Sequence, residues 1–179
     1  MPGSVQSFHI LQQVGATSSR RYWGINMKST LLALAILGAT AAPALAQDYS
    51  LSPNFGSVSL QAGFSPDPHQ LSLLAGGNLD AFSDTPLPGG CVGKISNAPD
   101  YAVYYDAGSL PLTFRTDSSR DTTLIINGPD GRWYCDDDSA GSLNARIRFA
   151  NPGSGVYHVW VGTFGDEMTR AVLNVTELE

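Results

Sequence analysis

After residue 47 the chain alternates between short apolar runs and clusters of turn-forming residues. The runs are rich in β-branched and aromatic side chains, and Gly, Pro, Asn and Asp separate them at intervals of roughly eight to twelve residues. No window carries an apolar stripe with the 3.6-residue period of a helix. The pattern predicts strands over residues 57–62, 70–75, 92–95, 102–105, 112–116, 122–127, 133–135, 145–150, 156–164 and 171–176.

The run 156–164 shows its two faces clearly. Tyr157 and Val159 alternate with His158 and Trp160. Successive side chains of a strand point to opposite sides, so the first pair is expected in the core and the second pair on the outward face.

The run 122–127 is apolar on both faces, which is typical of a central strand. The turn at 127–131, Asn-Gly-Pro-Asp-Gly, predicts a hairpin to the next strand. The segments 56–62 and 70–77 resemble each other and suggest a second hairpin. About ten short strands predict an all-β fold, namely a two-sheet antiparallel β-sandwich or jelly roll.

The N-terminal region has the features of an export signal. Residues 27–46 contain Lys28, an apolar run at 31–42 and an Ala-Leu-Ala cleavage site, and the apolar run is too short to span a membrane. We therefore expect a Sec-type signal peptide, cleavage just before Gln47 and a periplasmic or secreted protein. Residues 1–26 are interpreted as a mis-called start or a disordered extension, so that Met1 and Met27 both remain candidate initiators.

The predicted mature part, residues 47–179, is expected to form one domain with a strongly acidic charge. It holds seven of the ten basic residues and all sixteen acidic ones, a net charge of −9. Such a domain repels nucleic acid and anionic membrane surfaces. It attracts cations instead, and Ca²⁺ is abundant outside the cytoplasm.

The chain has two cysteines, Cys91 and Cys135, and both lie in the predicted mature part. In an oxidising compartment two cysteines of one domain most simply pair. There is no CxxC motif and no neighbouring histidine that would favour a metal site. The sequence therefore predicts a disulfide between them.

An acidic loop follows the second cysteine. Asp136, Asp137 and Asp138 are consecutive, and Asp121 begins a neighbouring predicted strand. Ca²⁺ takes six to eight oxygen ligands, which makes these four aspartates a candidate site. The spacing is not that of an EF-hand. The alternative is a solvated acidic turn without a metal.

Three aromatic residues form a candidate ligand-contact platform: Trp133, Tyr134 and Trp160. Such residues can stack on a sugar ring or a protein partner, and they can equally cover a sheet edge.

Ser139 stands in Asp-Asp-Ser-Ala-Gly, a superficial match to the segment around a chymotrypsin-type nucleophile. A triad needs a histidine held by a carboxylate, and neither His69 nor His158 has a suitable context. We therefore assign no catalytic residues.

Residues 121–164 carry a family resemblance. They read DTTLIINGPDGRWYCDDDSAGSLNARIRFANPGSGVYHVWVGTF. The Pro-Asp-Gly turn, the Asp-Asp-Ser loop, the Ile-x-Phe strand and the Pro-Gly-x-Gly-x-Tyr-x-Val-x-Val strand resemble the bacterial pre-peptidase C-terminal (PPC) domain. The resemblance implies a jelly-roll-like sandwich on a secreted protein. Some PPC relatives bind Ca²⁺ or polymeric substrates.

These observations favour an exported, non-catalytic binding or accessory module, with Ca²⁺ as a candidate stabilising ion. The expected partner is an extracytoplasmic protein or polysaccharide, with no nucleic acid and no membrane span. Two alternatives remain open at this point: a small protein related to chymotrypsin-type serine peptidases, and a structural protein of the envelope.

Overall fold

The computed structural model describes residues 47–179. The predicted signal segment 27–46 and the extension 1–26 lie outside the described residues. Within them, all regular secondary structure is β, in eleven strands. The strands are β1 (Ser57–Gln61), β2 (His69–Ala75), β3 (Leu79–Asp80), β4 (Lys94–Ile95), β5 (Tyr101–Asp106), β6 (Leu112–Asp117), β7 (Thr122–Asn127), β8 (Trp133–Asp136), β9 (Arg146–Phe149), β10 (Gly155–Thr163) and β11 (Thr169–Thr176).

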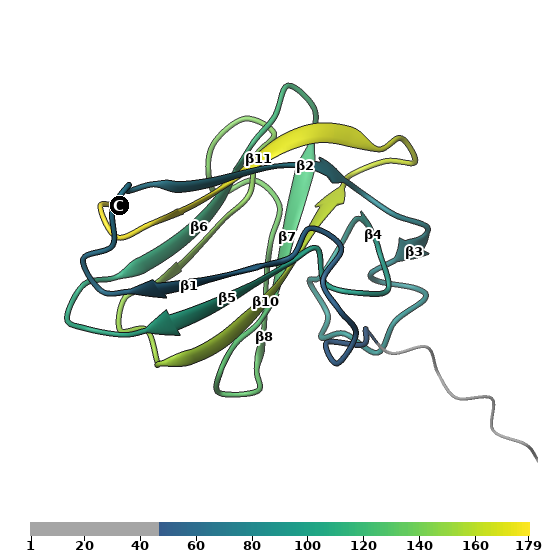
Figure 1. Ribbon diagram of the computed structural model, residues 1–179. Helices are drawn as coiled ribbons and strands as arrows, with labels where there is room; N and C mark the ends of the chain where they lie inside the picture. The colour runs from purple at the N-terminus through teal and green to yellow at the C-terminus, as the bar shows by residue number, and fades with distance from the viewer. Residues whose placement is uncertain (1–46) are drawn as a thin grey trace, which may run out of the picture. The chain divides into compact units, whose positions relative to one another are not determined.

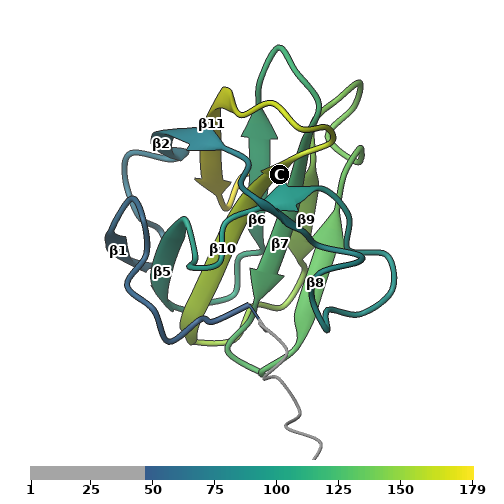
Figure 2. The same ribbon diagram turned by 90° about the vertical axis from the view of Figure 1, so that its right-hand side faces the viewer.

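The strands form two sheets that pack face to face (Figure 1). One sheet has seven strands, of which five lie side by side in the order β1, β5, β10, β7 and β8, as Figure 2 shows. On the same side of β10 as β5, but nearer its C-terminal end, β10 pairs with β4. β3 in turn pairs with β4. The other sheet has four strands in the order β2-β11-β6-β9. The predicted all-β two-sheet sandwich is confirmed.

Ten of the eleven strands were predicted from the sequence, each with ends within two residues of those observed. The exception is β3, a two-residue strand that pairs with β4 through Leu79 and Ile95. A strand this short has too few residues to show an alternating pattern. The predicted hairpin between β7 and β8 is present, with Leu124 opposite Asp136.

The predicted hairpin between the first two strands is wrong. β1 lies in the seven-stranded sheet and pairs in parallel with β5, whereas β2 pairs with β11 in the other sheet. The turn segment 62–68 carries the chain from one sheet to the other. Alternation identifies which face of a strand is buried but not which strand lies beside it, so similar neighbours need not pair.

The main core lies between the two sheets. Tyr157, Val159 and Val161 of β10 point into it, and each is fully buried, as predicted. Phe114 and Leu173 contribute from the four-stranded sheet. Burial of large side chains from both inner faces holds the sandwich together.

A second, smaller apolar cluster covers the outer face of the seven-stranded sheet, meaning the face turned away from the four-stranded sheet. Ile125 and Trp160 lie there beneath the segment 79–95, which contributes Ala81, Cys91 and Ile95. The central strands β7 and β10 are thus buried on both sides at this end. This explains why the run 122–127 is apolar on both faces.

The predicted disulfide is present. Cys91, in the covering segment, is bonded to Cys135 on β8, and their Cα atoms lie 5.1 Å apart. The bond fastens the segment 79–95 to the sheet that it covers. Such bonds form in oxidising compartments. No helix among residues 47–179 is long and apolar enough to cross a membrane.

Candidate functional site

The strongest candidate for a binding surface lies on the uncovered part of the outer face of the seven-stranded sheet. His158 on β10 is opposite Asn127 on β7, which in turn is opposite Trp133 on β8. Residues that pair across strands share a face, so His158 and Trp133 lie in one row of that face. We call Tyr49, Trp133 and His158 the aromatic patch.

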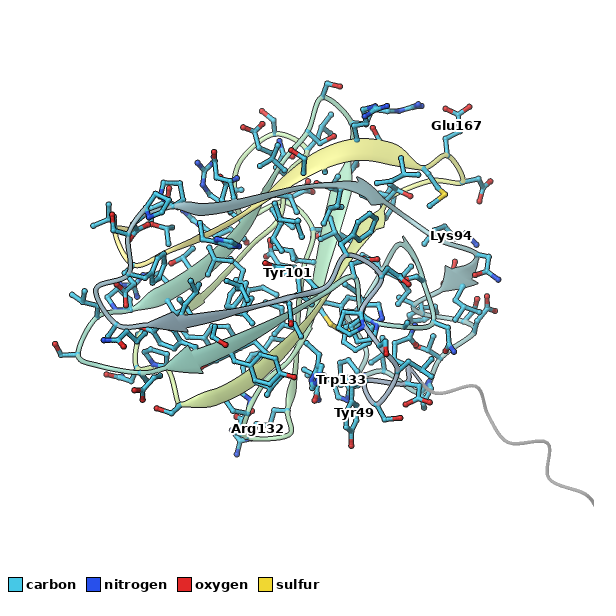
Figure 3. All side chains as sticks on the ribbon, viewed as in Figure 1. Tyr49, Lys94, Tyr101, Arg132, Trp133 and Glu167 are labelled. Atoms are coloured by element: carbon cyan, nitrogen blue, oxygen red, sulfur yellow. A yellow bond between two sulfur atoms is a disulfide. The ribbon has the colours of Figure 1, made fainter. Side chains whose placement is uncertain are left out.

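Tyr49 reaches the row from the stretch that precedes β1. Its ring centroid lies 5.6 Å from that of His158 and 6.5 Å from that of Trp133. Figure 3 shows Tyr49 and Trp133 beside each other at the same edge of the molecule. Tyr49 is 52% exposed, while Trp133 and His158 are half-buried. The patch therefore presents rings to solvent on a rigid support.

The ring of Trp133 packs against a second tryptophan, Trp160. Trp160 is fully buried, and its ring centroid lies 5.3 Å from that of Trp133. The neighbouring Cys135 is tied to the covering segment by the disulfide. These contacts hold the Trp133 ring in one orientation, which lowers the entropy lost when a ligand stacks on it.

His158 is electrically neutral at physiological pH. Burial lowers the pKa of its imidazole below the ordinary value of 6.5. Its Nδ1 atom is buried and has no hydrogen-bond partner among the described residues. A catalytic imidazole is held by a hydrogen bond at the second ring nitrogen. His158 lacks that arrangement, and its ring is tilted by 39° to that of Tyr49.

The predicted platform of Trp133, Tyr134 and Trp160 is wrong as a single surface. Tyr134 follows Trp133 in β8 and points to the inner face, where its ring packs 4.8 Å from that of Phe149. Trp160 does lie on the outer face, but the segment 79–95 covers it completely. Tyr134 is half-buried like Trp133, but it lines a separate depression with Phe149 and Tyr157, so the three rings do not share one surface.

Sequence reasoning missed Tyr49 and gave His158 no role. Tyr49 belongs to no strand, so no alternation assigned it a face. His158 was predicted on the outward face, which is confirmed, but its proximity to Tyr49 depends on how the N-terminal stretch crosses the sheet.

Tyr104, 49% exposed, lies one row away from His158 on the same face, opposite Val156.

The acidic loop is organised by Asp136. Its carboxylate accepts hydrogen bonds from the backbone N–H of Ser139 (2.9 Å), the backbone N–H of Arg146 (2.8 Å) and the hydroxyl of Ser139. These bonds close the loop and join it to β9. The Asp136 oxygens are thus already engaged within the protein.

Asp121 lies near the same loop. Burial raises the pKa of its carboxyl group, and the negative charges of Asp138 and Asp137 raise it further. Yet within residues 47–179 no three His, Cys, Asp or Glu side chains converge closely enough to hold a metal ion. The four aspartates do not fit a Ca²⁺ site as the structure places them, and calcium binding stays a prediction.

Ser139 and the two histidines have separate surroundings. The Ser139 hydroxyl donates to Asp136. His69 Nε2 lies 3.0 Å from the Tyr101 hydroxyl, and the two rings stack. His158 lies beneath Tyr49. None of these contacts joins a serine hydroxyl to an imidazole.

No protein-family model matches the chain, and no curated protein matches its sequence. The resemblance of residues 121–164 to the PPC domain stays a prediction.

Proposed function

We propose that residues 47–179 form an exported, non-catalytic binding module that holds a polysaccharide against the aromatic patch. The observation that carries the proposal is Tyr49 lying exposed over Trp133 and His158 on a rigid sheet. Aromatic rings of this kind stack on the C–H face of a sugar ring, which is apolar, while their hydroxyl and N–H groups remain available for sugar hydroxyls.

The surroundings of the patch support a binding role over a catalytic one. Burial favours the uncharged form of His158, and two of the three patch residues, Trp133 and His158, lie on strands. Tyr104 extends the surface by one row, so that a linear chain could lie across several strands.

Export is supported by two features. Residues 27–46 have the composition of a Sec-type signal, and the Cys91–Cys135 bond suits an oxidising compartment. A protein delivered to the periplasm or beyond meets cell-wall and extracellular polysaccharides. Such polymers offer the repeated sugar rings that an aromatic surface can bind.

The test is a glycan array followed by titration calorimetry with the best-bound glycan. Tyr49→Ala should weaken binding about tenfold, equivalent to about 1.4 kcal/mol, because it removes one stacking ring without opening the core. Phe164→Ala is the matched control, since Phe164 is an exposed aromatic (61%) that lies outside the patch.

A purified protein that bound no glycan would overturn the proposal. Equal losses for Tyr49→Ala and Phe164→Ala would also contradict it. Binding of a protein ligand at Tyr49, with no response to glycans, would replace the polysaccharide with a protein partner.

A further inference from the structure

The outer face of the four-stranded sheet carries a charge opposite to that of the rest of the protein. Residues 47–179 have seven basic side chains, and four of them are on this face: Arg115, Arg146, Arg148 and Arg170. Its acidic residues are Asp117 and Glu179. The face therefore has a net charge of about +2, and the remainder of the described residues about −11 at neutral pH.

Strand register places the arginines on one side of the sheet. Arg115 on β6 is opposite Arg146 on β9, and Thr113 is opposite Arg148. On the other side of β6, Asn174 of β11 is opposite Arg115, and Gln70 of β2 is opposite Asn174. One row across all four strands thus reads Gln70, Asn174, Arg115 and Arg146.

Further rows extend the face along the strands. Asp117, Val172 and Ser72 form the next row, and Arg170 and Leu74 the one after. Arg148 and Arg170 are three rows apart, a distance of about 20 Å along the strands at roughly 3.4 Å per residue. Between the guanidinium groups lie the exposed polar side chains of Gln70 and Ser72, the carboxylate of Asp117 and the half-buried Val172.

The arginines remain largely available to a partner. Arg146, Arg148 and Arg170 are exposed, and Arg146 and Arg170 form no ion pair within residues 47–179. Arg115 is half-buried, and its Nε atom lies 3.2 Å from a Glu179 carboxylate oxygen. Arg148 donates from Nε to the Glu179 carbonyl at 2.8 Å, which leaves its terminal nitrogens free to bind elsewhere.

The outer face of the four-stranded sheet has a depression at the end where Arg170 lies. This depression of about 670 Å³ is lined by Leu74, Asp117, Ser119 and Arg170 among others. Both polar and apolar groups line it, which suits a sugar ring with one apolar and one hydroxylated side.

We propose that this face binds a linear acidic polysaccharide, with the arginines on its carboxylate or sulfate groups. A guanidinium group matches a carboxylate with two parallel hydrogen bonds, and the exposed Gln70 and Ser72 supply partners for sugar hydroxyls. A protein with a net charge of −9 repels a polyanion everywhere except here, so the ligand is directed to this sheet. The site is separate from the aromatic patch on the other sheet and does not depend on it.

The test compares two forms of one polymer. Polygalacturonate and its fully methyl-esterified form have the same backbone, but only the first is charged. We expect the protein to bind polygalacturonate and not the ester, with an affinity that falls as NaCl is raised. Arg146→Gln combined with Arg148→Gln should weaken binding at least tenfold.

Both substitutions are on the exposed face of an edge strand and keep the backbone bond from Arg146 to Asp136. Arg132→Gln is the matched control, an exposed arginine remote from this sheet, and should bind like the native protein. Unfolding curves of the double variant and of Arg132→Gln check that each is folded.

Three results would overturn the proposal: equal binding of the charged and esterified polymers, no binding of polygalacturonate, or an equal loss with Arg132→Gln. A fourth would reassign the face to a second copy of this chain. In that case the protein self-associates at low salt, Arg146→Gln with Arg148→Gln abolishes the association, and the polymer does not bind.

Discussion

Asp100 is a buried carboxylate, 1% exposed, at the start of β5. It accepts hydrogen bonds from the backbone N–H of Val161 (2.8 Å), from Asn54 (3.1 Å) and from Ser96 (3.2 Å). Burial raises its pKa to about 6, and these hydrogen bonds only partly offset the effect. One side chain thus joins the stretch before β1 to the central strand β10.

The raised pKa makes stability depend on pH. The folded state binds the proton of Asp100 more tightly than the unfolded chain, whose pKa stays near 3.8. This contribution is complete below pH about 4 and is lost as the pH rises through about 6, an effect of about 3 kcal/mol. We expect Asp100→Asn to gain stability relative to the native protein between pH 4 and 7. Urea unfolding at several pH values measures this, and parallel pH curves for the two proteins would contradict it.

Ser139 is expected to be chemically inert. Its hydroxyl donates to Asp136, and both histidines of the described region have other contacts. A serine without a general base is a poor nucleophile. A fluorophosphonate probe should therefore leave the protein unlabelled, with trypsin as the positive control. Stoichiometric labelling that disappears in Ser139→Ala would show that the loop does carry a nucleophile.

At the scale of elements, the segment 79–95 depends on its disulfide. It has only the short strands β3 and β4, and it covers Trp160. The bond closes a loop of 44 residues, which stabilises the fold by about 4 kcal/mol in the chain-entropy model. Cys91→Ser with Cys135→Ser should lose about that much in urea unfolding. Its tryptophan emission should also shift to the red, because the cover over Trp160 loosens. Unchanged stability and emission would mean that packing alone holds the segment.

The acidic loop is the second element with a testable property. A closed Ca²⁺ site would add about 2.7 kcal/mol at a hundredfold excess over Kd and raise Tm by several degrees. Asp136 is instead engaged by Ser139 and Arg146. We therefore expect Ca²⁺ to change Tm no more than Na⁺ at matched ionic strength. A rise that is specific to Ca²⁺, removed by chelator and blunted in Asp137→Asn, would establish the site that the sequence suggested.

At the scale of the whole molecule, we predict a mature protein that begins near Gln47. Gln47 is buried, and its side-chain amide donates to the Ser96 carbonyl at 3.0 Å. The signal-like segment 27–46 ends immediately before it. N-terminal sequencing of the exported protein should give a start within about two residues of Gln47. A start at Met1 or Met27 on exported material would contradict the predicted cleavage.

The two outer faces of the sandwich differ in charge and in side-chain chemistry. One outer face carries uncharged rings, and the other carries four arginines on an otherwise acidic protein. The two proposals concern different sheets and are tested with different variants. Each can fail without the other.

The sequence by itself determined the strands, their buried faces and the disulfide. Alternation with a period of two is a local property, so it was readable in runs such as 122–127 and 156–164. Two cysteines in an otherwise cysteine-free chain leave only one intramolecular pairing.

Only the tertiary structure decided which strands are neighbours and what covers each face. Trp160 was predicted on the outer face and is there, yet it is buried because the segment 79–95 lies over it. Tyr49 gained a role because the stretch before β1 crosses the row of His158 and Trp133. The four arginines share a face only through the pairing of β11, β6 and β9. Such contacts join residues far apart in the chain, and local periodicity carries no information about them.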